Sequence, residues 1–464
     1  MANKHLQPQA VILSMTRDGE KLCAASGRIS TQPGDAVDIW NHSQDEAKNS
    51  LLIQKVTRSG HTSTVEHVCF HIAFQNVSVM VEQFMIEFRL ASFTVKSRRY
   101  VDFSTAGYYL PEELDGDARE AYIAHMNDLF TDYQYLLEHD VPKEDARFVL
   151  PYCFCSNFYC TLNGRELLHV LRAMLYGRGS RFPELAALGR QLLEQAQKVA
   201  PGVFASVEQA SSPDSPDLAG LSDLTTGSVF PQSRPFVELL AATPQAAECV
   251  ARTAFIQETQ LPGEEINRLM KSQQIRQEAL RRVIGCARPR ALENASFTFR
   301  LNGVSLPCVT HIVRHRMQSV MIPDLTKTDR TQKIIPPSVR RSPECLARYE
   351  AAFHRNAALY QKLRGAFTEE TLIYLLLSGN TLDVVTTMNA RELLLFLRLR
   401  TCNRAQWEIR IYADEMLRLL REKEPELFWA YGPSCYVTGR CPEGRLSCGK
   451  MQEVCEKYRP DQKD

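Results

Sequence analysis

The sequence predicts an α+β protein built from two homologous halves, each an antiparallel sheet flanked by helices. Three observations predict this class. One pattern of residues occurs twice along the 464-residue chain, each copy contains an alternating apolar stretch typical of a half-buried strand, and helical patterns follow without a regular βαβ alternation. With 44% hydrophobic and 23% charged residues, the composition is that of a globular protein.

The repeat rests on matches at one nearly constant separation. Residues 66–74, Glu-His-Val-Cys-Phe-His-Ile-Ala-Phe, correspond to residues 293–301, Glu-Asn-Ala-Ser-Phe-Thr-Phe-Arg-Leu, 227 positions later. Residues 163–168, Asn-Gly-Arg-Glu-Leu-Leu, return as Asn-Ala-Arg-Glu-Leu-Leu at 389–394, 226 positions later. Coincidental short matches would not keep one separation for so long, so we infer a tandem duplication and not a solenoid.

A stretch rich in Pro, Ser, Asp and Gly separates the two copies. Residues 210–220, Ala-Ser-Ser-Pro-Asp-Ser-Pro-Asp-Leu-Ala-Gly, and the prolines up to Pro235 offer too little apolar area to order themselves, which is typical of a linker. We therefore expect a domain over 1–209, a linker over 210–235 and a second domain over 236–464.

Each half is expected to contain a strand, a short helix, a longer helix and a final helix whose Asn is followed three residues later by Glu, as in a capping box. In the first half these are a strand at 68–74, a helix ending near Arg89, a helix at 117–138 and a helix from Asn163. In the second half they are a strand at 297–301, a helix ending near Arg316, a helix at 344–366 and a helix from Asn389 to Arg410.

Charge and cysteine content narrow the class of protein. The formal net charge of +1 gives no bulk attraction to nucleic acid or to an anionic membrane. No stretch approaches the ~18 apolar residues of a membrane span, and the N-terminal residues lack the apolar core of a signal peptide. Fourteen cysteines in such a chain favour reduced thiols or metal ligands over a disulfide framework. We expect a cytoplasmic protein that binds neither nucleic acid nor a membrane.

A dense cationic triplet, Arg314-His315-Arg316, follows the apolar pair Ile312-Val313. Alternating cationic side chains near a strand-to-helix junction can hold phosphates or a flavin pyrophosphate through charge-assisted hydrogen bonds. A solvated basic turn is the alternative reading of the triplet.

Helical geometry separates the cations that follow Asn389. At 100° per residue, Asn389, Leu393, Phe396 and Arg400 lie on one stripe, whereas Arg391 lies about half a turn from Arg400 and must meet another partner or water. An Arg on a partly apolar stripe needs an anion, because an unpaired buried charge is costly. The anion is either a ligand or a structural carboxylate.

The first half has its own anion-binding candidates. Ser97-Arg98-Arg99-Tyr100 combines a hydroxyl, two guanidinium groups and an aromatic ring, which is suited to a nucleotide phosphate with a stacking surface. Arg147, before the apolar run 148–151, is a second candidate. An exposed basic strand edge is the alternative.

Other motifs are absent or weak. The chain has no GxGxxG, no Walker phosphate loop and no HExxH, which disfavours a Rossmann dinucleotide fold and a zinc protease. Cys435, Cys441, Cys448 and Cys455 in the tail could close a zinc site, but their spacing lacks tight CxxC pairs, and we favour free thiols.

With these residues in view, the chain resembles the flavin-dependent thymidylate synthases over nearly its whole length, twice. The resemblance is carried by residues 389–409, which include Asn-Ala-Arg and Arg-Ala-Gln-Trp-Glu-Ile, and by Arg314-His315-Arg316, which resembles the first part of that family's RHR-x7-S signature. In the first half it is carried by His61, Glu66-His67, Leu90-Ala-Ser-Phe, Ser97-x-Arg99-Tyr100 and the segment from Val141-Pro through Arg147 to Pro151.

This resemblance implies an α+β fold, FAD, and reductive methylation of dUMP to dTMP with methylenetetrahydrofolate as carbon donor and NADPH as reductant. It implies no cysteine nucleophile, and active sites built between the subunits of a homotetramer. Flavin contacts would come from Arg314, His315, Arg316, Asn389, Arg391 and His61. Nucleotide contacts would come from Ser97, Arg99, Tyr100, Arg147 and Gln83, with Arg400 as the catalytic residue that polarises the uracil ring.

The two halves depart from the family pattern in complementary ways. In the first half, Glu87-Phe88-Arg89 stands in place of the triplet and Met174 in place of Arg400. In the second half, the counterparts of Ser97, Arg99, Tyr100 and Arg147 are Asp324, Thr326, Lys327 and Ile373. An aspartate would repel a phosphate, so we expect this second cradle to be dead. In the first half, Val95 replaces an acidic or amide residue that the family usually has.

This pattern predicts composite sites, with the nucleotide cradle from the first half and the flavin triplet from the second, in a homodimer that mimics the family's tetramer. A related enzyme acting on another pyrimidine nucleotide and a non-catalytic nucleotide- or flavin-binding scaffold are the alternatives. A scaffold would lose site residues at random, whereas the losses here are reciprocal.

Overall fold

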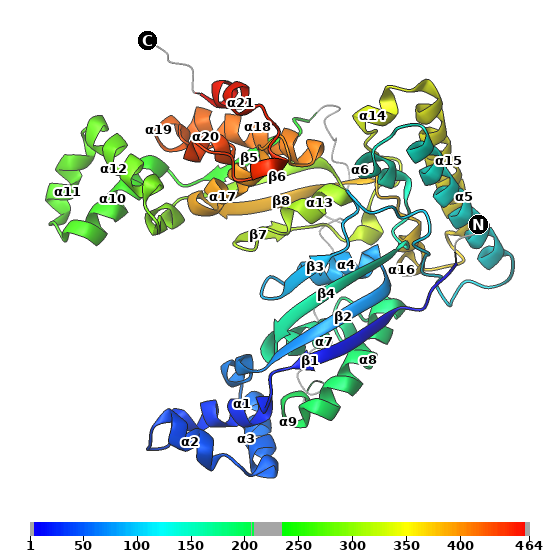
Figure 1. Cartoon of the computed structure of the whole chain (residues 1–464), viewed down its shortest axis with the longest axis horizontal. Coiled ribbons are helices and arrows are strands. Elements are labelled where there is room, and N and C mark those ends of the chain that lie inside the picture. Colours follow the sequence, from blue (N-terminus) through cyan, green and yellow to red (C-terminus); the bar gives the residue numbers. More distant parts are fainter. Residues whose placement is uncertain (1–3, 206, 208–233, 460–464) are drawn as a thin grey trace, which may run out of the picture. The chain divides into compact units, whose positions relative to one another are not determined.

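The computed structural model describes residues 4–205, 207 and 234–459, which form two compact units (Figure 1). Unit 1 consists of Met1–Phe230 together with Ile335–Gly379, and unit 2 of Pro231–Ile334 together with Asn380–Asp464. Most of the expected linker lies outside the described residues. Residues 335–379, which we call the exchanged segment, belong to the second half in sequence but to unit 1 in structure.

Each unit contains one four-stranded antiparallel sheet with the same topology. In unit 1 the order is β1-β2-β4-β3, and in unit 2 it is β5-β6-β8-β7. The expected strands are therefore confirmed as β2 and β6, which are the second strand of each half and an inner strand of its sheet. The strand bounds are β1 Gln9–Met15, β2 Cys69–Ser78, β3 Ser92–Val95 and β4 Cys155–Asn163, then β5 Val237–Ala242, β6 Ser296–Ser305, β7 Gln318–Met321 and β8 Thr381–Asn389.

The helices also repeat in order, and the expected helices appear in both halves (Figure 1). The first set is α1 Gly19–Ile29, α2 Ala36–His42, α3 Glu46–Arg58, η1 Thr62–His67, α4 Val79–Ile86, α5 Gly116–Glu138, α6 Lys143–Ala146, η2 Arg147–Val149, α7 Gly164–Leu175, α8 Pro183–Val199 and α9 Pro201–Phe204. The second set is α10 Ala246–Thr259, α11 Gly263–Met270, α12 Gln273–Gly285, η5 Arg290–Asn294, α13 Leu306–Ile312, α15 Pro343–Leu363, α16 Glu369–Leu372, η7 Ile373–Leu375, α17 Ala390–Arg400, α18 Trp407–Lys423 and α19 Pro425–Phe428. The second half adds η6 Leu325–Lys327, α14 Pro337–Arg340, α20 Ser434–Thr438, η8 Gly444–Leu446 and α21 Met451–Tyr458.

A bulge bends the second strand of each sheet at equivalent positions. Asn76 and Gly303 have positive φ values of 56° and 70°, and the strand pairing shifts register around them. The amide of Asn76 donates to Oδ1 of Asn157 over 3.1 Å, and that of Gly303 donates to Oδ1 of Asp383 over 3.0 Å. The same local device thus orients the strand end that leads into α4 and into α13.

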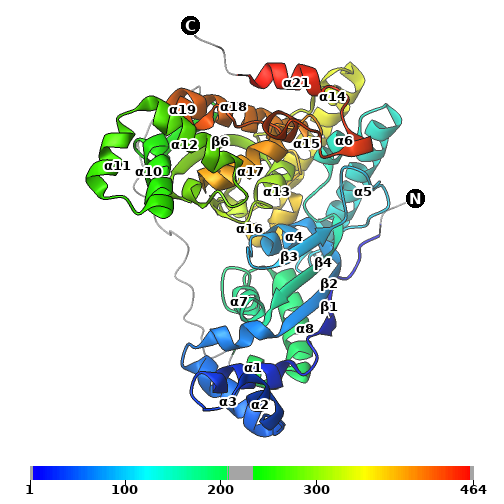
Figure 2. The same ribbon diagram turned by 60° about the vertical axis from the view of Figure 1, so that its left-hand side comes forward.

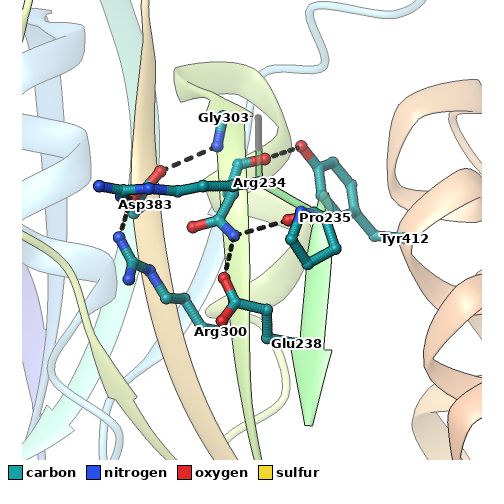
Figure 3. Close-up of polar contacts among 8 residues, drawn as sticks. Arg234, Pro235, Glu238, Arg300, Gly303, Asp383 and Tyr412 are labelled. Atoms are coloured by element: carbon teal, nitrogen blue, oxygen red, sulfur yellow. Dashed lines mark hydrogen bonds and ion pairs between the residues drawn. The ribbon is translucent and has the colours of Figure 1, made fainter. Parts of the chain in front are cut away.

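In unit 2 the bulge also holds the chain at the end of the expected linker (Figure 3). Asn302 donates to the carbonyl of Pro235 over 2.7 Å and to Glu238 over 2.6 Å, while Tyr412 of α18 donates to the carbonyl of Asn302 over 2.7 Å. Arg300 pairs with Asp383 over 2.6 Å. The contact between Asn302 and Glu238 therefore adds a side-chain link to the backbone pairing of β5 with β6, while Asp383 and Tyr412 join β6 to β8 and α18.

A buried Ser–Glu pair joins two helices in each unit, α4 to α8 in unit 1 and α13 to α18 in unit 2. Ser78, the N-cap of α4, donates its backbone N–H and its hydroxyl to Glu184 of α8 at 2.8 and 2.6 Å. Ser305, the N-cap of α13, makes the same two bonds to Glu408 of α18 at 2.8 and 2.5 Å. The duplication has kept both the cap and its carboxylate partner.

The two long helices of the repeats, α5 and α15, lie side by side in unit 1 (Figure 1 and Figure 2). Asp132 of α5 is 1% exposed and pairs with Arg348 of α15 over 2.5 Å and also with Arg355. Nε2 of His125 lies 3.0 Å from Oδ1 of Asn356. The exchanged segment is thereby tied into the core of unit 1 by polar contacts.

One expected boundary is wrong. The helix from Asn389 ends at Arg400, and α18 begins at Trp407, so the single helix to Arg410 is in fact two. Gln406 accepts a hydrogen bond from the N–H of Ile409 and so caps α18, while the chain turns between Cys402 and Ala405. Among the described residues, no helix is long and apolar enough to cross a membrane.

Candidate functional site

The structure brings two of the predicted phosphate ligands of unit 1 to one carboxylate residue. Nε of Arg99 lies 2.8 Å from Oε1 of Glu144, and Arg147 donates from its Nε to the backbone carbonyl of Glu144 over 2.9 Å. Arg147 is 3% exposed, whereas the side chain of Arg99 is 24% exposed. Arg99 and Arg147 thus contact the same residue, Glu144, whose carboxylate partly neutralises the charge of Arg99.

Ser97 and Tyr100 lie on either side of Arg99 in the turn after β3. The hydroxyl of Ser97 accepts a hydrogen bond from the N–H of Arg99 over 3.3 Å. The guanidinium of Arg99 lies 5.5 Å from the ring centre of Tyr100, which is 65% exposed. An exposed ring beside a cationic cradle provides a stacking surface next to an anion site.

Gln83 of α4 gives an independent indication of a ligand in unit 1. Its side chain is 2% exposed, and neither its amide oxygen nor its amide nitrogen has a hydrogen-bond partner among the described residues. A buried polar amide without partners is costly, so such a group in a folded protein calls for a ligand or ordered water. This is the behaviour expected of a predicted substrate contact.

A buried ion pair holds the turn that carries these residues. Arg98, 8% exposed, donates to Oε1 of Glu82 over 2.7 Å, and the other oxygen of Glu82 accepts from the hydroxyl of Ser156 over 2.6 Å. This structural role of Arg98 was not expected from the sequence. Its signal was Glu82 itself, a lone carboxylate in the apolar run Val79–Ile86, which needs a buried partner.

In unit 2 the cationic triplet follows the end of α13, and its three side chains differ in exposure. Arg314 and Arg316 are exposed, whereas His315 is 5% exposed. Nδ1 of His315 lies 2.9 Å from Oε1 of Glu392, and Nε of Arg400 donates to its Nε2 over 3.1 Å. Both ring nitrogens of His315 are therefore engaged inside unit 2, and a cofactor contact of this residue stays a prediction.

Burial is the main influence on the pKa of His315. It lowers the pKa of His315 below its ordinary value, Arg400 lowers it further, and the hydrogen bond to Glu392 opposes the change only in part. A neutral ring also fits the geometry, because Arg400 can only donate and Nε2 must accept.

The other second-half candidates lie at the start of α17. Asn389 is the N-cap and accepts from the N–H of Glu392 over 2.9 Å, which confirms the predicted cap. Arg391 turns away from Arg400 to pair with Glu293 over 2.5 Å, as the helical geometry indicated. The Glu392 side chain does not close a capping box, because it bonds to His315 instead.

The remaining predicted residues lie outside these two groups. His61 is exposed at the start of η1 in unit 1. Asp324 accepts from the N–H and the hydroxyl of Thr326 at 3.0 and 2.8 Å, so it caps a local turn. All fourteen cysteines are free, and no three His, Cys, Asp or Glu side chains of the described chain are placed to hold a metal. The zinc alternative for Cys435, Cys441, Cys448 and Cys455 therefore finds no support.

A cavity of about 750 Å³ in unit 2 lies between α10, α12 and η5, and no predicted site residue lines it. Its wall is mainly apolar and includes Phe255, Ile275 and Val283, with Arg288 also lining it. Arg288 stands 227 positions after His61, so this cavity adjoins the second-half counterpart of that candidate.

Comparison with known proteins matches both halves to one family. The family described as "Thymidylate synthase complementing protein" matches residues 11–202 and 238–426. The flavin-dependent thymidylate synthase of Geobacter sulfurreducens is 34% identical over 229 residues, covering 48% of this chain and 97% of that protein. The one from Clostridium tetani is 32% identical over 241 residues, covering 48% and 96%. Among solved structures, the UMP/dUMP methylase PolB from Streptomyces cacaoi, bound with 5-Br dUMP, is 22% identical with a TM-score of 0.40, covering 45% of this chain and 97% of that chain.

Proposed function

Because the chain belongs to the thymidylate synthase complementing protein family, which it matches twice along its length, we propose that it is a flavin-dependent thymidylate synthase converting dUMP to dTMP. The observation that carries the proposal is reciprocal retention. The first half keeps the anion cradle and has lost the triplet, whereas the second half keeps the triplet and Arg400 and has lost the cradle. Each retained set is also built with internal partners in its own unit.

The triplet residues fit an FAD. Arg314 and Arg316 are two exposed guanidinium groups at the end of one helix, and such planar forks bind diphosphate oxygens in pairs. We assign FAD to Arg314, Arg316, Asn389 and Arg391, with His61 as a further contact. Bound FAD supplies the hydride that completes the methyl group, with methylenetetrahydrofolate as carbon donor and NADPH as reductant.

The cradle residues fit a nucleotide monophosphate. Arg99 and Arg147 would bind the phosphate together with Ser97, and the buried amide of Gln83 would find its missing partners on the nucleotide. Tyr100 offers its exposed ring beside them.

Arg400 would donate hydrogen bonds to the uracil ring and stabilise the negative charge that develops there during methylation. Burial raises the pKa of the Cys23 thiol to about 12 and also raises that of Cys153 and Cys160, so these three cysteines are unsuited to act as a thiolate nucleophile.

Purified protein tests the assignment directly. We expect flavin absorption bands that shift when dUMP is added, and release of tritium from dUMP labelled at C5 in the presence of methylenetetrahydrofolate and NADPH. The substrate would instead be another pyrimidine nucleotide if the protein binds FAD and oxidises NADPH in the presence of UMP but not in the presence of dUMP. A colourless preparation that takes up no added FAD would overturn the proposal.

The composite character of the site requires a separate experiment. We propose that a homodimer combines the cradle of one half with the triplet of the other, so Arg99→Met and Arg400→Met should each inactivate the enzyme. When the two variants are co-expressed with different tags and the mixed dimer is isolated, a site built across chains regains an intact pair and hence activity. A site built within one chain stays inactive in the mixed dimer. Full activity of either single variant would contradict the composite site.

A further inference from the structure

The contacts of His315 give it a role in unit 2 that differs from cofactor binding. Glu392, His315 and Arg400 form a continuous line of hydrogen bonds, 2.9 Å from Oε1 to Nδ1 and 3.1 Å from Nε2 to Nε. The ring is 5% exposed and packs edge-on against Phe396, with ring centres 4.9 Å apart and planes at 66°. Its orientation is therefore fixed by two hydrogen bonds and one aromatic contact.

The tautomer of His315 follows from its partners. The Nε of Arg400 carries a hydrogen and has no lone pair to offer, so Nε2 of His315 must accept and the single ring proton must lie on Nδ1. The carboxylate of Glu392 accepts a hydrogen bond from this Nδ1–H and so holds the ring in this tautomer. The line of groups is anionic, neutral and cationic in turn.

The hydrogen bond at Nε fixes the orientation of the whole guanidinium group of Arg400. The guanidinium is planar, so a bond at Nε sets the plane of the group and the direction in which both Nη atoms donate. A side chain with several rotatable bonds would otherwise have to be ordered each time it meets a planar ligand. An acceptor already in place removes that cost.

The first half of the chain serves as an internal comparison. There Phe88 occupies the position of His315 and Met174 that of Arg400, and both are buried apolar residues. Glu166 is retained at the position of Glu392, beside an Asn cap, and its carboxylate lies 3.7 Å from Nδ1 of His169. The acceptor and the arginine were thus replaced together, whereas the glutamate stayed.

We propose that His315 is a positioning residue whose neutral ring, oriented by Glu392, holds the guanidinium of Arg400 in the plane that the uracil ring requires. The proposal deepens the proposed function and rests on it for the identity of the ligand.

The surroundings predict how pH acts on this arrangement. Glu392 and Arg400 face the ring from α17, Arg314 and Arg316 flank it in the chain, and His311 precedes it in α13. Protonation of Nε2 would remove the acceptor and place a second cation against Arg400. Since burial lowers the pKa of His315, this loss is confined to the acid side of its ordinary titration range.

Two substitutions separate hydrogen bonding from packing. His315→Gln places an amide oxygen near the position of Nε2 and can still accept from Arg400, whereas His315→Phe keeps a buried ring, as in the first half, but has no acceptor. We expect His315→Phe to lower kcat by about a hundredfold and His315→Gln by less than about tenfold, with the acid limb of the kcat profile missing in His315→Gln. Both variants should keep the FAD content of the wild-type protein.

The outcomes distinguish the proposals. Loss of FAD from both variants would make His315 a cofactor ligand and overturn the positioning role. Equal activity of His315→Phe and wild type would also overturn it, as would an unchanged acid limb in His315→Gln. Absence of dUMP turnover in the wild-type protein would instead refute the proposed function. Should His315→Phe fail to fold, the pH profile of His315→Gln decides alone.

Discussion

The phenol of Tyr374 donates a 2.9 Å hydrogen bond to Oε2 of Glu184, so a residue of the second repeat completes the shell of a carboxylate fully buried in the first. Ser78 provides the other two hydrogen bonds to this carboxylate. One hydrogen-bond network of Ser78, Glu184 and Tyr374 therefore joins α4, α8 and the exchanged segment inside unit 1.

Glu184 should make the stability of unit 1 depend on pH. Burial raises its pKa from the ordinary 4.5 to about 7, and the folded state therefore holds a proton that the unfolded chain releases. The stabilisation is complete below about pH 4.5 and is lost as pH rises to about 7, by up to about 3 kcal/mol. Denaturant titrations at several pH values should show that the gap in unfolding free energy between wild type and Glu184→Gln changes over this window. Glu113→Gln, at an exposed position, is the control and should show a constant gap.

The contact between α5 and α15 should depend on Asp132. Replacing it with Asn leaves Arg348 and Arg355 without their shared carboxylate, and because both arginines are over a third exposed, we expect a modest loss of about 1–3 kcal/mol. Asp128→Asn, exposed on the same helix, should cost little. Thermal unfolding of the two variants side by side provides the measurement, and equal melting temperatures would show that the pair contributes nothing.

The nucleotide should bind to the first-half cradle and not to its second-half counterpart. Arg99→Met should weaken dUMP binding by about tenfold to a hundredfold, because it removes a charge-assisted pair of hydrogen bonds to phosphate. Lys327→Met removes the cation of the second cradle, where Asp324 already caps a turn, and should leave the affinity unchanged. Isothermal titration calorimetry with dUMP compares them. A larger effect at Lys327 would reverse the assignment of the two halves.

The first half should not fold by itself. A fragment of residues 1–209 lacks Arg348, Asn356 and Tyr374, which pair with buried polar groups of unit 1. We expect it to aggregate when expressed alone and to be recovered when fragment 236–464 is co-expressed. A monomeric fragment 1–209 with a cooperative unfolding transition would show that the exchanged segment is dispensable.

Local features of this fold follow from the sequence. Asn163 and Asn389 cap their helices as predicted, because capping involves only neighbouring residues. Arg391 points away from Arg400 because 3.6 residues make a turn. The stop at Arg400 was missed because residues 401–406 contain neither Gly nor Pro, and a Gln provides the next cap.

Long-range features could not be predicted in the same way. A repeat shows that two helices are alike but does not show which sheet each one packs against, so the exchange of residues 335–379 was not foreseen. The partner of His315 was missed for a related reason. Glu392 has the spacing of a capping box, and only the folded chain shows that its carboxylate turns to a residue 77 positions earlier.

The exchanged segment also governs when the protein can mature during synthesis. Since Ile335–Gly379 completes unit 1, the ribosome must translate most of the message before the sheet of unit 1, which is synthesised first, can pack against the exchanged segment. Nascent chains must therefore wait with an unfinished N-terminal lobe, and a gene truncated within the second copy would deprive both lobes at once.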